Sequence, residues 1–189
     1  MSASLIILVL LDLFSVSVFC QRTYSATNKT YTYFEDVHNE QFTHMTVNDY
    51  TEQVYVGGVN KIYQLSRNLK LEAVAEMGPQ DDSPECNAQF CSQAMKRKTD
   101  YWNKVLLIDY PQSRLISCGS LFQGICSVHK LDNVTHFETP ANESVVANNA
   151  AASTVAFMAP GPPKLPSFHV LYVGVSYTGD GPYRADVPA

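Results

Sequence analysis

The residues that could do chemistry in this 189-residue chain are scattered and do not form a catalytic motif. No two histidines have the HExxH spacing of a zinc protease. Ser127, His129 and Asp132 share one short segment, but a catalytic triad is assembled by the fold and not by nearness in sequence. The chain also lacks a GxSxG elbow, a P-loop and a GxGxxG fingerprint. We therefore expect no enzyme activity, no cofactor and no bound metal. The five histidines are His38, His44, His129, His136 and His169.

Cysteine is the other reactive residue type, and its arrangement indicates cross-links. Apart from Cys20, the chain has an even set of four: Cys86, Cys91, Cys118 and Cys126. Four cysteines allow three pairings, of which the pairing of sequence neighbours is the simplest because each bond closes a short loop. The alternatives are buried free thiols or a zinc site, and zinc sites usually show the CxxC pairs that are absent here.

The first twenty residues have the character of a secretory signal peptide. Leu5–Leu11 is a continuous apolar run, and small or uncharged residues lead to a cleavage site after Cys20. No Lys or Arg precedes the run, and Asp12 interrupts the segment. The alternative is a membrane anchor, but this requires about 20 apolar residues. We expect residues 21–189 to form the mature chain.

Three Asn-x-Ser/Thr sequons support export. They begin at Asn28, Asn133 and Asn142. A sequon matters only where the chain enters the secretory pathway and the asparagine is exposed. Together with a leader and paired cysteines, the sequons predict an exported glycoprotein.

Composition narrows the function further. The chain is 46% hydrophobic and 16% charged, which is typical of a folded domain. Its formal net charge of −5 argues against a general nucleic-acid binder, which would carry a basic face.

Short β-strands separated by turn signals account for most of the chain after residue 41. This spacing favours a β-sandwich or β-propeller over alternating strands and helices. Gly57-Gly58 is expected to break two strands into a hairpin. The expected strands lie at 42–47, 54–56, 62–65, 69–76, 105–108, 114–117, 125–131, 155–158 and 168–175.

The remaining stretches are expected to be irregular. Residues 21–40 are a leader or an irregular first strand, and 78–103 are a long loop. The basic triplet Lys96–Lys98 in that loop is a solvated face, with a ligand patch or a furin-type site as alternatives. Residues 140–152 form a short helix or a loop.

The segment from Leu115 to Asn133 resembles the cysteine-framed hairpin of plexin sema domains. It contains Cys118-Gly-Ser-Leu-Phe-Gln-Gly-Ile-Cys126. Upstream, residues 42–66 look like the first sema blade, and 103–119 resemble the stretch that leads into the hairpin. Residues 152–160 and 168–175 look like the next blade. Semaphorins and other sema-bearing receptors differ in the hairpin, so the resemblance favours plexins.

The resemblance implies an all-β fold: the first blades of a seven-bladed sema-type β-propeller in which sequential cysteines pair. It supports Cys118–Cys126 well and Cys86–Cys91 less strongly. Propeller blades take about 40–50 residues, so residues 21–189 would hold about three blades of an incomplete sema domain. We therefore expect the N-terminal part of a larger type I membrane receptor.

The implied function is that of a plexin-type cell-surface receptor for semaphorins, acting in axon guidance and cell migration from the extracellular side of the plasma membrane. The resemblance leaves open a co-receptor and self-association through the ectodomain. Two alternatives remain: a secreted semaphorin-like ligand or other sema-domain protein, and a secreted hydrolase on a propeller scaffold.

Overall fold

The computed structural model describes residues 31–38, 41–87, 90–141, 143–162 and 168–187. The chain divides into two units, 1–31 and 32–189, and the strands of the described residues belong to the second unit. The predicted signal peptide at 1–20 lies outside the described residues.

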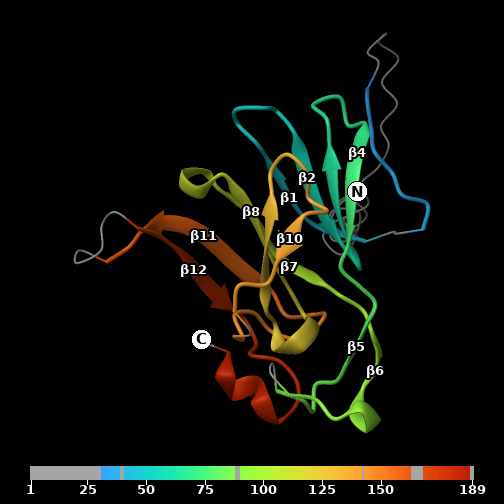
Figure 1. The fold of residues 1–189 in the computed structure, drawn as a ribbon, viewed down its shortest axis with the longest axis vertical. Helices are drawn as coiled ribbons and strands as arrows, with labels where there is room; N and C mark the ends of the chain where they lie inside the picture. Colours follow the sequence, from blue (N-terminus) through green and yellow to red (C-terminus); the bar gives the residue numbers. More distant parts are fainter. Residues whose placement is uncertain (1–30, 39–40, 88–89, 142, 163–167, 188–189) are drawn as a thin grey trace, which may run out of the picture. The chain divides into compact units, whose positions relative to one another are not determined.

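Two four-stranded antiparallel sheets form the main body of the second unit (Figure 1). In each sheet, strands that are neighbours in sequence pair with one another. The first sheet contains β1 (Phe42–Val47), β2 (Val54–Gly58), β3 (Lys61–Leu65) and β4 (Leu71–Glu76). The second sheet contains β7 (Asn103–Asp109), β8 (Arg114–Gly119), β9 (Cys126–Lys130) and β10 (Phe137–Glu138).

Two smaller strand pairs complete the regular structure. The third sheet contains β11 (Thr154–Pro160) and β12 (His169–Val175), and a short arm pairs β5 (Gln80–Asp82) with β6 (Arg97–Thr99). The helical segments within the described ranges are short 3₁₀ turns, so the all-β expectation is confirmed. These turns are η1 (Gln93–Met95), η2 (Tyr110–Gln112), η3 (Leu121–Gln123) and η4 (Pro182–Asp186).

The expected hairpin is present, but the expectation that the glycine pair forms its turn is wrong. Gly57 and Gly58 belong to β2, and the hairpin turn lies at Val59-Asn60, where Asn60 has a φ of 63°. Gly57 is needed for close packing, because a Cβ atom there would lie 2.4 Å from Oδ1 of Asn103 on β7. Gly57 is therefore required because β2 and β7 approach each other closely, and not because the chain turns there.

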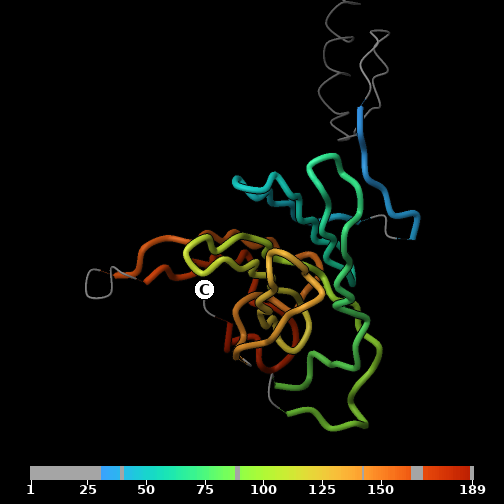
Figure 2. The backbone as a smooth tube through the Cα atoms, turned by 45° about the horizontal axis from the view of Figure 1, so that its top comes forward, coloured from blue at the N-terminus to red at the C-terminus, as the bar shows by residue number. Residues whose placement is uncertain are grey.

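The expectation of an unbroken loop over 78–103 is also wrong, because the β5–β6 arm lies within it. Asp81 pairs with Lys98 across the arm, and their side chains form an ion pair of 3.1 Å. Figure 2 traces the chain from the first sheet through this arm into the second sheet. One start differs for a clear reason: β4 begins at Leu71 and not at residue 69, because Leu69 has a φ of 58°. The two-residue strand β10 was not expected.

Two other segments are irregular. The described part of 21–40 contains no strand, and the described part of 140–152 contains no helix, in line with the loop alternative. The Asp36 carboxylate ties the first of these segments to β3 by accepting hydrogen bonds from Tyr63 Oη (2.8 Å) and Lys61 Nζ (3.0 Å). The His38 amide, Tyr63 and Lys61 together lower the pKa of Asp36 to about 2.

The apolar core of the described residues consists of three clusters, two of which lie on opposite faces of the second sheet. Alternate residues of a strand point to opposite faces. Accordingly, Leu106 and Ile108 pack toward Tyr55 and Ile62 of the first sheet. The intervening residues face the third sheet, where Val105, Leu107 and Ile116 pack with Ala156, Met158, Leu171 and Val173.

Hydrogen bonds from the first sheet also hold the loop that joins β9 to β10. Tyr55 Oη donates to the Leu131 carbonyl at 2.7 Å. Gln64 Nε2 donates to the Asp132 carbonyl at 3.1 Å, and Gln64 Oε1 accepts from the Val134 amide at 3.0 Å. Gln64 is only 2% exposed and Val134 is fully buried, so the contact between this junction loop and the first sheet is enclosed, although other residues of the loop are exposed.

Replacing Gln64 by leucine should therefore destabilise the second unit. The variant leaves the buried Val134 amide without a partner, which costs about 1–3 kcal/mol, and also removes the hydrogen bond to the Asp132 carbonyl. Gln93→Leu, on the exposed turn η1, is the matched control and should change the free energy of unfolding little. Denaturant unfolding of both variants measures the difference. Equal effects would show that the junction does not depend on Gln64.

Candidate functional site

The cysteine hairpin is the best-defined local feature of the second sheet. Cys118 of β8 lies directly opposite Cys126 of β9, and the two form a disulfide. Cys86 and Cys91 form the second disulfide within the β5–β6 arm. All four cysteines after the predicted leader are thus bonded in pairs, and none is a free thiol or a zinc ligand.

The hairpin tip has an unusual backbone. Phe122, Gln123 and Gly124 have successive φ angles of 53°, 66° and 85°. Positive φ is uncommon for residues other than glycine and persists only where surrounding contacts hold it. Here the contacts come from Gly124, whose carbonyl accepts hydrogen bonds from the amides of Val145 (2.9 Å) and Val146 (3.0 Å).

Gln123 connects this tip to two other segments. Its side chain is 3% exposed. Nε2 donates to the carbonyls of Ser83 and Cys86 in the arm. Oε1 accepts from Nδ2 of Asn148 at 2.8 Å, and Asn148 Oδ1 in turn accepts from the Asp180 amide. The tip is therefore a hub that holds the arm and the connection around Asn148, and Asn148 in turn holds the segment around Asp180.

A chain of buried polar groups runs beneath the hairpin. His129 Nδ1 lies 2.8 Å from the Val134 carbonyl, which can only accept, so this nitrogen carries the proton. His129 Nε2 then accepts from Ser117 Oγ at 2.9 Å. Tyr101 Oη lies 3.5 Å from Ser117 Oγ, and Asn103 Nδ2 donates to Tyr101 Oη at 3.1 Å.

This arrangement does not form a catalytic triad. The histidine contacts Ser117 and not Ser127, and its second nitrogen faces a carbonyl where a triad has a carboxylate. His129 is 1% exposed, so a substrate could not reach it. Burial lowers the pKa of His129 and raises the pKa of Tyr101, so both stay neutral near pH 7. The group is a structural network.

Neither a metal centre nor a membrane span is present in the part of the chain that the structure describes. No three or more His, Cys, Asp or Glu side chains gather there in a way that could hold a metal ion. No helix within the described ranges is long and apolar enough to cross a bilayer.

Asn133 has an ordered geometry within its predicted sequon. Its Oδ1 accepts hydrogen bonds from the amide (3.0 Å) and the hydroxyl (2.7 Å) of Thr135. The side chain is thereby fixed in a turn on the partly exposed side of the junction loop. Asn28 and Asn142 lie outside the described residues, and glycosylation remains a prediction for all three.

An exposed aromatic pair marks the outer side of the third sheet. Phe157 and Tyr172 are directly opposite in register, and their rings stack with centroids 5.2 Å apart. Phe157 is 56% exposed and neighbouring Val155 is 68% exposed. Contiguous exposed apolar side chains are typical of surfaces that contact protein.

The polar residues that hold the site together have no distinct local pattern in the sequence. Gln64 lies in a strand pattern where a buried apolar residue would fit equally well, and Gln123 lies between turn residues. The only sequence signal for Gln123 is its position between Cys118 and Cys126. Its partners are 37 to 40 residues earlier and 25 residues later in the chain, so local patterns could not reveal them.

Comparison with known proteins confirms the plexin resemblance. No family model matches the chain. It is 38% identical to human (Homo sapiens) Plexin-A4 over 120 residues, which is 61% of this chain. It is 35% identical to mouse (Mus musculus) Plexin-B2 over 152 residues, or 76% of this chain. The chain spans only 6% and 8% of the length of these two relatives.

The fold is similar to a solved structure as well. The full extracellular region of Plexin A4 matches 71% of this chain with a TM-score of 0.60 and 32% sequence identity. The match covers 15% of that solved chain.

Gly124→Ala should disrupt the hairpin tip. The new Cβ would lie 1.5 Å from the Val146 carbonyl oxygen, at a φ of 85° that residues with a side chain rarely adopt. We expect a loss of more than about 2 kcal/mol in the free energy of unfolding. Gly174→Ala is the matched control, since its nearest neighbour would be 3.4 Å away. Thermal unfolding of the secreted variants is the measurement, and similar unfolding of both would refute the role of the tip.

The buried His129 should make the second unit less stable in mild acid. The unfolded chain binds a proton at this residue near a pKa of about 6.5, whereas burial lowers the pKa in the folded chain. The free energy of unfolding should therefore fall as the pH drops below about 6.5, by at most about 1.4 kcal/mol per pH unit for this group. His44, whose pKa burial also lowers, acts in the same direction.

Denaturant unfolding between about pH 7.5 and 5.5 tests this expectation. His129→Gln should flatten the slope, while His136→Gln, at an exposed position, should leave it unchanged. An unaltered slope in the His129 variant would contradict the assignment.

Proposed function

We propose that this chain is the N-terminal part of a plexin-type receptor ectodomain that recognises semaphorins through protein–protein contact. The observation that best supports this proposal is the cysteine hairpin, which occurs in a chain that is similar to plexins in sequence and in fold. The relatives are much longer than this chain, so the activity of a whole receptor is part of the proposal.

The packing of the sheets supports a propeller. β7, the first strand of the second sheet, lies against β1, the first strand of the first sheet, and also against β11 of the third sheet. Propeller blades are arranged in this way, with the first strands grouped around a central axis and each sheet packed face to face on the next. On this proposal, β1–β4 and β7–β10 are two complete blades and β11–β12 begin a third, within a seven-bladed sema domain.

The chemistry of the chain supports a recognition role at the outer face of the plasma membrane. Two disulfides are typical of an oxidising compartment. We include in the proposal that residues 1–20 direct secretion and that Asn28, Asn133 and Asn142 carry glycans. The Ser117–His129 pair is enclosed, which speaks against a hydrolase and for a binding module without enzyme activity.

The proposed biological role is semaphorin–plexin signalling in axon guidance and cell migration, with a co-receptor and self-association of the ectodomain as further elements. The second candidate is a secreted semaphorin-like ligand or another sema-domain protein. Such a protein would bind plexins, so partner choice distinguishes the two.

Binding on cells tests the proposal. Cells expressing the complete reading frame that contains this chain are incubated with purified semaphorin ectodomains and, separately, with plexin ectodomains. We expect saturable binding of at least one semaphorin at micromolar concentration or below. Gly174→Ala should preserve this binding, and Gly124→Ala should abolish it through misfolding. Binding of plexins without any semaphorin would favour the ligand alternative, and binding of neither would refute the proposal.

A further inference from the structure

The turn that joins β1 to β2 presents a tyrosine to solvent. Tyr50 lies in this turn and is 83% exposed, more than any other large hydrophobic side chain of the described residues. Its hydroxyl forms no hydrogen bond with any residue that the structure describes. Figure 1 shows the turn at one end of the first sheet. The phenol is therefore accessible to an enzyme that approaches the folded chain.

Backbone contacts hold Tyr50 in a defined position. The Glu52 amide donates to the Asn48 carbonyl at 2.8 Å, and the Tyr50 amide donates to Asn48 Oδ1 at 3.0 Å. The ring packs edge-on against Tyr110 of η2, with centroids 5.2 Å apart. None of these contacts uses the Tyr50 hydroxyl, so a phenylalanine at this position would keep all of them.

The turn around Tyr50 is acidic. Asp49 directly precedes it, Glu52 follows two residues later, and residues 45–55 contain no Lys, Arg or His. Glu52 pairs with Arg67 at 3.0 Å, but both side chains are exposed, and an ion pair of this kind contributes little in water. Asp49 forms no ion pair within the described ranges. An uncompensated carboxylate therefore lies beside the free phenol.

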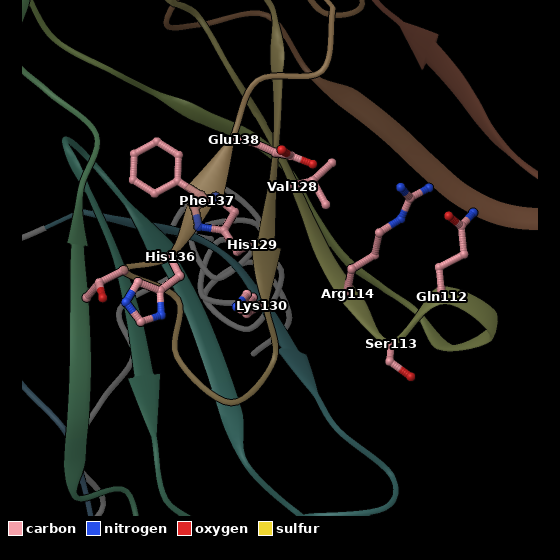
Figure 3. A pocket seen from close by; sticks show the side chains of 10 residues that line it. Gln112, Ser113, Arg114, Val128, His129, Lys130, His136, Phe137 and Glu138 are labelled. Carbon is pink, nitrogen blue, oxygen red and sulfur yellow. The ribbon is translucent and has the colours of Figure 1, made fainter.

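The hollow that begins at η2 does not offset this negative charge. It has a volume of about 620 Å³, and Arg114 and Lys130 line it (Figure 3). Arg114 is already paired with Asp109 at 2.8 Å, and Glu138 lines the same hollow. Two cations and two carboxylates thus balance one another there, and Tyr50 is not part of the lining.

Tyr33 is exposed to a similar degree, at 71%, but its surroundings differ. Lys29 precedes it, and the four residues before it include no carboxylate. Glu35 and Asp36 follow it, yet Asp36 is paired with Lys61 at 3.0 Å. The tyrosine in the β1–β2 turn is thus the one with a free carboxylate directly before it.

We propose that Tyr50 is O-sulfated by a tyrosylprotein sulfotransferase of the secretory pathway. The donor of such an enzyme is an activated sulfate nucleotide with several negative charges, so a basic cleft must bind it. A basic cleft also attracts a tyrosine that is flanked by carboxylates. Modification there requires export, so this site rests on the part of the proposed function that directs the chain to the secretory pathway.

The transfer is a displacement at sulfur with no oxidation or reduction. The phenol oxygen of Tyr50 attacks the sulfur of the mixed phosphate–sulfate anhydride in the donor, and an oxygen–sulfur bond forms. The bond between sulfur and the bridging oxygen breaks, and the nucleotide phosphate leaves with the electron pair. The phenol proton passes to a base of the enzyme. The product carries one sulfate ester, which adds a fixed negative charge to the turn.

The test uses the full chain secreted from cells that are grown with radioactive sulfate. N-glycans are removed from the purified chain, because they can also carry sulfate. Alkaline hydrolysis and chromatography then measure labelled tyrosine O-sulfate, and mass spectrometry locates the added SO₃ group. We expect one SO₃ group on Tyr50 that a phosphatase does not remove.

Matched variants locate the site and test the role of charge. Tyr50→Phe should abolish the labelled tyrosine O-sulfate, whereas Tyr31→Phe combined with Tyr33→Phe should leave it unchanged. Asp49→Asn should lower the label several-fold, because it removes the carboxylate next to the phenol. Glu35→Gln, at an exposed position beside Tyr33, is its control and should have no effect. Thermal unfolding checks that each variant is folded.

Three outcomes would overturn the inference: no tyrosine O-sulfate on the secreted chain, a label that persists in Tyr50→Phe, or a modification that a phosphatase removes. A chain that does not reach the medium would instead contradict the export in the proposed function. The purified chain is then incubated with a purified sulfotransferase and its donor, and an unmodified Tyr50 in that reaction would overturn this inference by itself. Semaphorin binding does not enter any of these measurements.

Discussion

The structure depends on one strand that is buried on both faces. β7 contains the apolar run Val105–Ile108, and each face of this run needs an apolar cover. The first sheet covers one face and the third sheet covers the other. A sheet whose first strand must be enclosed in this way cannot be an end layer of the molecule. Face-to-face stacking of successive sheets is the physical basis on which a propeller interpretation rests.

Burial of β7 also brings polar groups into the interior, and the fold satisfies most of them with backbone atoms. Lys104, only 5% exposed, donates from Nζ to the carbonyls of Ala150 and Ala152 and forms no ion pair within the described ranges. Burial without a carboxylate partner lowers its pKa. The same principle applies at Gln64 and Gln123, which bind carbonyls and amides of distant loops. Side-chain amides supply both a donor and an acceptor, and so they can fix irregular backbone that strands cannot reach.

The sequence predicted those features that depend on local patterns. Alternating apolar residues and glycine or proline turns located nine strands to within a few residues, because strand formation on a half-buried sheet follows a period of two. Gly57 shows the limit of this reasoning. Its role is set by Asn103, 46 residues later, and a glycine in a strand looks locally like a turn. The β5–β6 arm escaped prediction for a related reason, since its strands have three residues each and are joined by an ion pair and hydrogen bonds across a long connection. Likewise, His129 was noticed beside Ser127, but its true partner Ser117 lies across the strand pair.

Which polar side chains are buried and which are exposed determines which of them are available to a partner or a substrate. The histidine and serine that could have supported catalysis are enclosed between the sheets, where burial keeps the histidine neutral and excludes substrate. Accessible polar groups include Lys130, at the end of β9, and His136, in the connection before β10. Rigid sheets hold these connections in fixed positions, and the hairpin hub does the same for the arm. A surface of this kind is suited to binding extended partners by many separate contacts. It follows that changes in the buried network should alter recognition only by altering stability, whereas changes at exposed side chains should alter recognition directly.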